Sequence, residues 1–106
     1  MKRTEKLLAP LASLKAQEKY IIGASKDEYY VPDELLEQAS SSLILEDQTG
    51  SVKYLKKKID DLVFPGRYSA HELVHECQPW VELREVTKAY LKEIGFDLKE
   101  WEENEL

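Results

Sequence analysis

The chain has 106 residues, enough for one domain with a single core, and its aromatic content of 9% is typical of a folded chain rather than a disordered one. Its 21 acidic and 15 basic residues give a formal net charge of −6, which opposes general attraction to nucleic acid or anionic lipid. The one cysteine excludes an internal disulfide, and an unpaired thiol suits a reducing compartment.

The chain lacks the sequence features of a membrane span or a signal peptide. No run approaches the roughly 20 apolar residues of a spanning helix. The positive start is not followed by an apolar run, because Pro10 and Lys15 interrupt it. We therefore expect a cytoplasmic protein with a single domain over residues 1–106, in which residues 102–106 form a frayed acidic tail.

The first segment, residues 4–22, places apolar side chains near helical spacing and ends at Gly23. Pro10 is either a kink or the first-turn residue of this helix. Residues 20–22 and 29–31 are β-prone triplets on either side of residues 23–28. A small β-hairpin near residues 20–31 is therefore an alternative to a simple loop.

A second helix begins at Pro32, whose fixed φ suits a first turn and which is followed by two carboxylates. Residues 43–45 could instead form a short strand, since three serines interrupt the pattern just before them. After a turn at residues 48–50, Ser51 can cap a third helix. The apolar face expected for that helix consists of Val52, Leu55, Ile59, Leu62 and Val63.

Three further helix signals follow. Ser69 and Glu72 form a capping-box pattern at the start of a short helix. Pro79 opens a helix over about residues 80–94, and Gly95 is its natural C-terminal stop. A last turn begins at Asp97. For the long helix the main apolar positions are expected to be Val81, Val86, Ala89, Tyr90 and Ile94. These signals predict a mainly α fold, a compact bundle of four to five short helices, with the hairpin as the α+β alternative.

The segment His71-Glu72-Leu73-Val74-His75 fits the pattern H-E-x-x-H and so resembles the zinc-peptidase motif. In such a site the two histidines, one helical turn apart, bind zinc, and the glutamate takes a proton from the zinc-bound water. In the branch that uses glutamate as third ligand, that ligand comes from a following helix, and Glu93 resembles it in position. The resemblance implies zinc held by His71, His75 and Glu93, with Glu72 as the general base.

Several residues argue against that interpretation. Glu72 is the third residue after Ser69, so the capping box competes for its carboxylate. The charged Glu76 follows the second histidine directly, where such peptidases usually have an uncharged residue. Cys77 lies off the face of both histidines, so it is expected to be a buried core thiol rather than a nucleophile.

Three surface patterns are candidate binding sites. Lys53 and Lys56 to Lys58 could contact phosphates, although Asp60 and Asp61 favour an ordinary solvated face. Tyr29 and Tyr30 could form a recognition surface, because tyrosine is enriched at interfaces. Trp101, set among glutamates, could dock on a basic surface of a partner.

No catalytic set beyond the histidine motif is evident in the sequence. We expect a small acidic interaction or regulatory domain without catalytic activity or cofactor, whose partner is another protein, with Tyr29, Tyr30 and Trp101 at the interface and self-association left open. The alternative is a minimal zinc-dependent peptidase that uses His71, Glu72 and His75. Nucleic-acid binding through the lysine cluster comes third.

Overall fold

A computed structural model describes residues 3–44, 46, 49–62 and 66–106. In these residues the chain is all-α, with seven α-helices, one π-helical turn and no strand, which confirms the predicted mainly α fold. The elements are α1 (Arg3–Ala12), α2 (Leu14–Gln17), η1 (Glu18–Ile22), α3 (Pro32–Ile44), α4 (Gly50–Asp60), α5 (Ala70–His75), α6 (Gln78–Glu93) and α7 (Leu98–Glu105). No helix of the described residues is long and apolar enough to cross a membrane.

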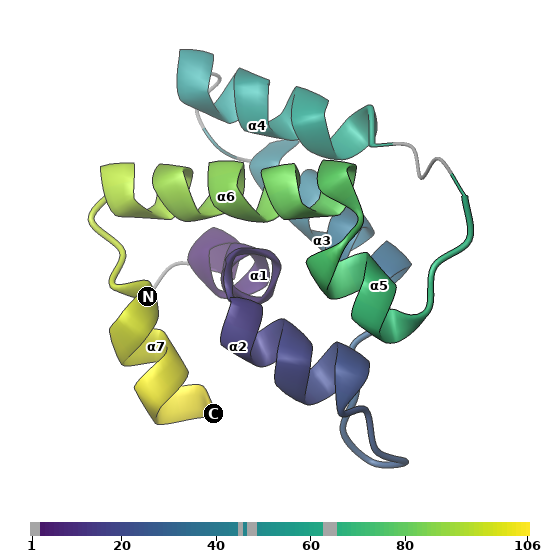
Figure 1. Ribbon diagram of the computed structural model, residues 1–106. Helices are drawn as coiled ribbons and strands as arrows, with labels where there is room; N and C mark the ends of the chain where they lie inside the picture. Colours follow the sequence, from purple (N-terminus) through teal and green to yellow (C-terminus); the bar gives the residue numbers. More distant parts are fainter. Residues whose placement is uncertain (1–2, 45, 47–48, 63–65) are drawn as a thin grey trace.

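Helix α6 is the longest element, and the others are arranged around it (Figure 1). It packs against α1 on one side and α4 on the other. Helices α4 and α6 run antiparallel, since Ser51 near the start of α4 bonds Glu93 at the end of α6 and Lys58 lies 4.0 Å from Glu82. Helix α3 packs on α1 and α4, α5 packs on η1, and α7 packs on α1 and α6.

The first segment is not one helix, as the sequence suggested, because the chain breaks at Ser13. The Ser13 hydroxyl accepts a hydrogen bond from the amide of Ala16 at 3.0 Å and so starts α2. Pro10 lies inside α1 rather than in its first turn. Beyond Gln17 the backbone widens into the π-helical turn η1, which sets the path into the following loop.

A buried polar network fixes the elbow between α1 and α2. The Gln17 side chain, 0% exposed, donates to the carbonyls of Pro10 and Leu11 at 3.1 and 2.9 Å, so it satisfies carbonyls that the end of α1 leaves free. Its own carbonyl accepts from Trp80 Nε1 at 3.0 Å and from Arg84 Nη1 at 2.9 Å. This side chain therefore joins the elbow to α6.

The buried face of α6 differs from the predicted one. The side chains that face the core are Trp80, Leu83, Arg84, Thr87, Tyr90 and Leu91. Of the predicted positions, Ala89 and Ile94 are exposed. The hydrophobic pattern misled here because two polar residues are buried, and each has its own partner. Thr87 Oγ1 donates to the carbonyl of Leu83 at 2.7 Å, and Arg84 donates to Gln17 and to the carbonyl of Val74.

No β-hairpin forms at residues 20–31. Residues 20–22 belong to η1, and the side chain of Ile21 reaches the core from this helical backbone rather than from a strand. The loop does reverse direction, with a hydrogen bond of 2.9 Å from the Tyr30 amide to the Tyr20 carbonyl. The strand alternative at residues 43–45 is also wrong for its first two residues, which end α3, and residue 45 lies outside the described part of the chain.

Helix starts and stops follow local signals in most places. The predicted capping box at Ser69 is confirmed, and Asp97 caps α7 by accepting from the Glu100 amide at 3.0 Å. Gly95 has a φ of +80°, which favours glycine, and the amide of Phe96 closes the end of α6 on the carbonyl of Leu91 at 2.8 Å. The predicted cap of α4 is wrong by two residues, since Thr49 rather than Ser51 accepts from the Val52 amide.

Candidate functional site

The two histidines of the H-E-x-x-H segment lie together on the exposed side of α5. The ring centroids of His71 and His75 are 4.8 Å apart, as a spacing of one helical turn predicts. His75 Nε2 lies 3.4 Å from Glu18 Oε2 of η1. The histidine pair therefore faces solvent beside one carboxylate.

The glutamate between them is engaged at the helix start. Glu72 Oε1 accepts from the Ser69 amide at 3.2 Å, and the Glu72 amide donates to Ser69 Oγ at 3.2 Å. Hydrogen bonding to the Glu72 carboxylate by the Ser69 side chain, and then by the Ser69 backbone amide, lowers the pKa of Glu72. A carboxylate with a lowered pKa is a weaker base, so this environment suits a cap better than a proton acceptor.

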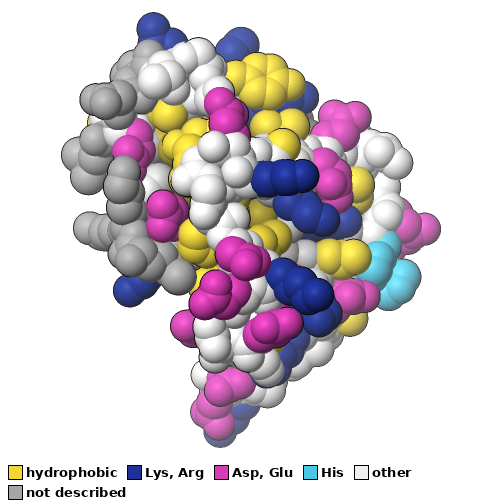
Figure 2. All heavy atoms as spheres, turned by 90° about the vertical axis from the view of Figure 1, so that its left-hand side faces the viewer, with side chains coloured by type: hydrophobic (Ala, Val, Ile, Leu, Met, Phe, Trp, Pro, Cys, Tyr) yellow, Lys and Arg dark blue, Asp and Glu magenta, His cyan; other side chains and the backbone are white. Residues whose placement is uncertain are grey.

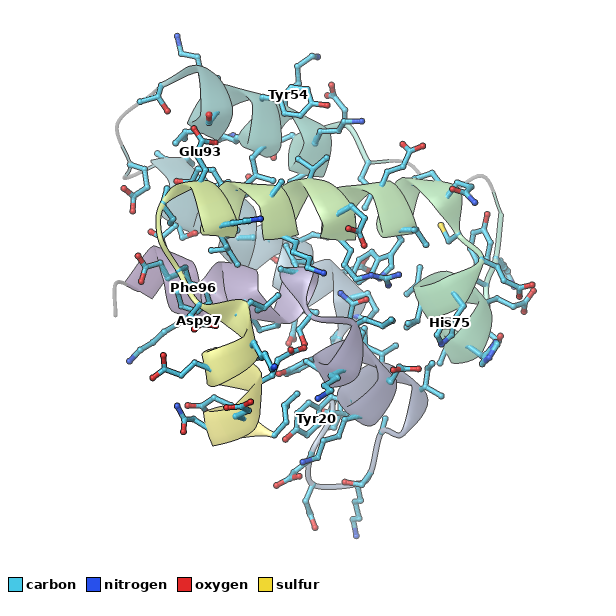
Figure 3. All side chains as sticks on the ribbon, turned by 60° about the vertical axis from the view of Figure 1, so that its left-hand side comes forward. Tyr20, Tyr54, His75, Glu93, Phe96 and Asp97 are labelled. Carbon is cyan, nitrogen blue, oxygen red and sulfur yellow. The ribbon has the colours of Figure 1, made fainter. Side chains whose placement is uncertain are left out.

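The structure does not bring Glu93 to the histidines. Glu93 lies in the last turn of α6, where its two oxygens accept from Ser51 Oγ at 3.0 and 3.1 Å. Figure 3 shows Glu93 at one end of α6 and His75 on α5, near the other end of α6. Among the residues the structure describes, no three or more His, Cys, Asp or Glu side chains are placed to hold a metal ion. Zinc binding by the histidine pair stays a prediction.

The single cysteine lies in the core. Cys77 is 0% exposed and precedes the first turn of α6. Burial, helped by the neighbouring Cys77, raises the pKa of Tyr68. Cys77 is therefore the buried core thiol that the sequence predicted.

The lysines of α4 are largely matched by carboxylates. Lys56 Nζ lies 2.5 Å from Asp60, and Lys57 Nζ lies 2.6 Å from Asp61. The hydrogen bond from Lys56 lowers the pKa of Asp60, which shows that the pair favours the charged state. Lys58 lies 4.0 Å from Glu82 and 5.9 Å from the ring centre of Tyr54. Phosphate contacts would compete with these neighbours.

The two tyrosines of the predicted surface differ in burial: Tyr30 packs against the fold, whereas Tyr29 is exposed to solvent. Tyr30 packs against both hydrophobic clusters of the fold, and its ring centroid lies 4.8 Å from that of Tyr20. Burial, with smaller contributions from Tyr20 and Glu105, raises the pKa of Tyr30 to about 12. Tyr29, by contrast, is 58% exposed.

Trp101, which the sequence suggested as an interface residue, is largely covered by the fold, and its role at an interface stays a prediction. It is 8% exposed and packs with Ala9 and Ala16, because α7 turns its apolar side toward α1 and α2. Only a small part of the ring remains open to a partner. The predicted fraying of residues 102–106 stays a prediction, although α7 continues to Glu105.

A groove between α1 and α7 was missed from the sequence as a site. Its volume is about 330 Å³, and its lining includes two aromatic side chains and four carboxylates: Phe96, Trp101, Glu5, Asp97, Glu100 and Glu105. Figure 2 shows acidic side chains gathered over the lower half of this face, with basic side chains among them. The helical spacing of Asp97, Glu100, Trp101 and Glu105 could be read from the sequence. The position of Glu5 beside them could not, because it depends on how α1 packs against α7.

No protein-family model, no curated protein and no solved structure matches the chain significantly. Function is therefore argued from the geometry and chemistry of the surfaces above.

Proposed function

We propose that this protein is a non-catalytic interaction domain that binds another protein through its tyrosine loop, residues 23–31. The observation that carries the proposal is the exposure of Tyr29 on a loop whose backbone is held by hydrogen bonds on both sides. The loop projects from the lower end of the molecule, beyond η1 (Figure 1). A partner could therefore reach it without displacing a helix.

The backbone of the loop is tied at three places. Ser25 and Glu28 exchange hydrogen bonds of 3.0 and 3.1 Å across a tight turn. The Tyr30 amide donates to Tyr20, and the carbonyl of Val31 accepts from the first turn of α3 at 3.1 Å. A loop already fixed in one conformation loses less entropy when it binds, so more of its contact energy appears as affinity.

Tyr29 has the chemistry of an interface anchor. A tyrosine ring offers a large contact area and a hydroxyl that can donate or accept, and it has only two side-chain torsions to fix. The adjacent Tyr30 is half-buried and packs against the hydrophobic core, which limits movement of Tyr29 relative to the helices. Tyrosines in such positions often contribute a large share of binding free energy.

The other two hypotheses have less support. The peptidase would need Glu72 as a base and Glu93 as a ligand, while Glu72 belongs to a capping box and Glu93 lies at the far end of α6. Nucleic-acid binding would have to separate Lys56 and Lys57 from their aspartates. An acidic net charge of −6 adds a further cost to approaching phosphates.

The test compares two tyrosines of nearly equal exposure. Tyr29 is 58% exposed and Tyr54, on α4, is 56% exposed, so Tyr54→Ala is a matched control for Tyr29→Ala. Figure 3 places Tyr54 at the opposite end of the molecule from Tyr20 and its loop. Proteins retained from cell extract by wild type and both variants would be quantified by mass spectrometry, and binding then repeated with purified components by calorimetry.

We expect a partner that the wild type and the Tyr54 variant bind alike and that Tyr29→Ala binds more weakly by roughly thirtyfold, as for an interface hot spot. Circular dichroism should show the same helix content in all three proteins. Equal retention of every partner by the Tyr29 and Tyr54 variants would refute the tyrosine loop as the binding surface.

A further inference from the structure

We propose that the groove between α1 and α7, called here the α1–α7 groove, binds an arginine side chain on a segment of a partner protein. This surface is separate from the tyrosine loop, and the proposal does not depend on Tyr29. It rests on the shape of the groove, its mixed aromatic and acidic lining, and the way α7 is fixed to the rest of the fold.

The shape of the groove suits a single long side chain. Its volume of about 330 Å³ is at the lower end of the range for ligand sites. The apolar part of the lining comes mainly from Phe96, which is half-buried, and to a smaller extent from Trp101, which is 8% exposed. Figure 3 shows Phe96 and Asp97 side by side where α6 gives way to α7. An aliphatic stem and a flat cation could pack there.

The negative charge of the groove favours a cationic ligand. Four carboxylates line it, from Glu5, Asp97, Glu100 and Glu105, whereas none of the described lining residues is a lysine or arginine. The carboxylates come from two helices and the turn before α7, so they approach a central side chain from different directions. An anionic ligand such as a nucleic-acid phosphate would be repelled.

The groove is held open by contacts outside its lining. Ser13 Oγ donates to Glu102 Oε2 at 2.5 Å, which attaches α7 to the elbow between α1 and α2. Lys19 Nζ donates to the carbonyl of Leu106 at 2.9 Å. At the other end, the turn at Gly95 fixes the position of Phe96. The groove therefore does not have to be assembled when a ligand arrives.

Arginine fits this lining better than lysine. The guanidinium group is planar, stacks on aromatic rings and offers five donors, which can reach carboxylates at several positions. A lysine ammonium is a compact, strongly hydrated charge and gains less from Phe96. The occupant that best matches both the ring and the carboxylates is therefore an arginine.

The test uses defined peptides and the two tryptophans of the chain. We would titrate ¹⁵N-labelled protein with the capped peptide Gly-Gly-Arg-Gly-Gly and with its lysine counterpart. The indole N–H of Trp101 should shift in a saturable way with the arginine peptide, and more weakly with the lysine peptide. The indole of Trp80, which is 1% exposed and bonded to Gln17, should not shift and serves as the internal control.

Charge-matched variants separate the groove from the net charge. Glu100→Gln with Glu105→Gln removes two charges from the groove, while Glu76→Gln with Glu103→Gln removes two exposed charges elsewhere. We expect the groove variant to bind the arginine peptide roughly threefold to tenfold more weakly and the control variant to bind as the wild type does. If the groove variant loses helix content, Glu105→Gln alone, at the last residue of α7, replaces it.

Three results would overturn the proposal. The first is no shift of Trp101, the second is equal binding by the two charge-matched variants, and the third is equal binding of the lysine peptide. Sedimentation velocity tests whether the groove binds a second copy of this chain instead. A wild-type dimer that is lost in the groove variant would show this and would also overturn the proposal. Tyr29→Ala should bind the arginine peptide as the wild type does, so failure of one surface would not imply failure of the other.

Discussion

Two groups of polar side chains, one buried beside the α1–α2 elbow and one exposed at the start of α5, make hydrogen bonds of similar length in different surroundings. Gln17 and Arg84 are 0% and 7% exposed, whereas Ser69 and Glu72 are exposed to solvent. Water can replace a lost partner at α5 but not at the elbow. The difference teaches that burial, rather than the number of hydrogen bonds, sets the energetic importance of each group.

The largest effect is expected at the elbow. Gln17→Leu removes four hydrogen bonds, those with the carbonyls of Pro10 and Leu11, the indole N–H of Trp80 and the guanidinium of Arg84. We expect the free energy of unfolding to fall by about 3–5 kcal/mol, because the buried groups lose hydrogen bonds to Gln17 that water cannot replace there. Urea denaturation followed by circular dichroism measures this change.

The matched control is the same substitution on an exposed helix position. Gln38 lies on the outer side of α3, and Gln38→Leu should change the free energy of unfolding by no more than about 0.5 kcal/mol. Comparable losses for Gln17→Leu and Gln38→Leu would show that the buried network has no special role in stability.

A smaller effect is expected at the start of α5. Ser69→Ala removes the hydroxyl that accepts from the Glu72 amide, and loss of such a cap costs about 1 kcal/mol. Ser51→Ala is the informative comparison. Ser51 looked like a helix cap in the sequence, but its hydroxyl donates to the carboxylate of Glu93 on α6 instead. Chemical denaturation should rank Ser69→Ala as the more destabilising change, and the reverse order would contradict the assignment of the caps.

The smallest effect is expected at Glu72 and depends on pH. Glutamine can still accept from the Ser69 amide, so Glu72→Gln removes only the charge. Because the pKa of Glu72 is lowered in the folded state, its charge stabilises the fold above the unfolded pKa of about 4.3, and this contribution is lost as the pH falls through the folded pKa. Melting temperatures of the two proteins should therefore differ slightly at pH 7 and converge near pH 3. A difference that grows with falling pH would contradict this sign.

Features that depend on neighbouring residues could be predicted from the sequence. The capping box of Ser69 and Glu72, the stop at Gly95 and the cap at Asp97 each involve residues within about five positions of one another. The mainly α class followed from the same helix signals. The histidine pair also lies on one face of α5, as its spacing required.

Features that depend on distant contacts could not be predicted. The break at Ser13 is stabilised by Glu102 and by α6 through Gln17, at separations of 89 and 63 residues. The buried face of α6 includes Arg84 only because Gln17 and Val74 supply acceptors there. The α1–α7 groove likewise needs Glu5 beside α7. A single sequence carries no direct signal for such pairings.

The most direct measurement is the zinc content of untagged protein purified without chelator, compared with a His71→Ala, His75→Ala variant. It decides whether the motif on α5 is a helix start in an interaction domain or part of a metal centre. We expect less than about a tenth of a zinc ion per chain, in both proteins and after reconstitution with added zinc. Close to one zinc per wild-type chain, lost in the variant, would contradict the assignment of the motif as a helix start alone and make Glu72→Gln the next test of peptidase activity.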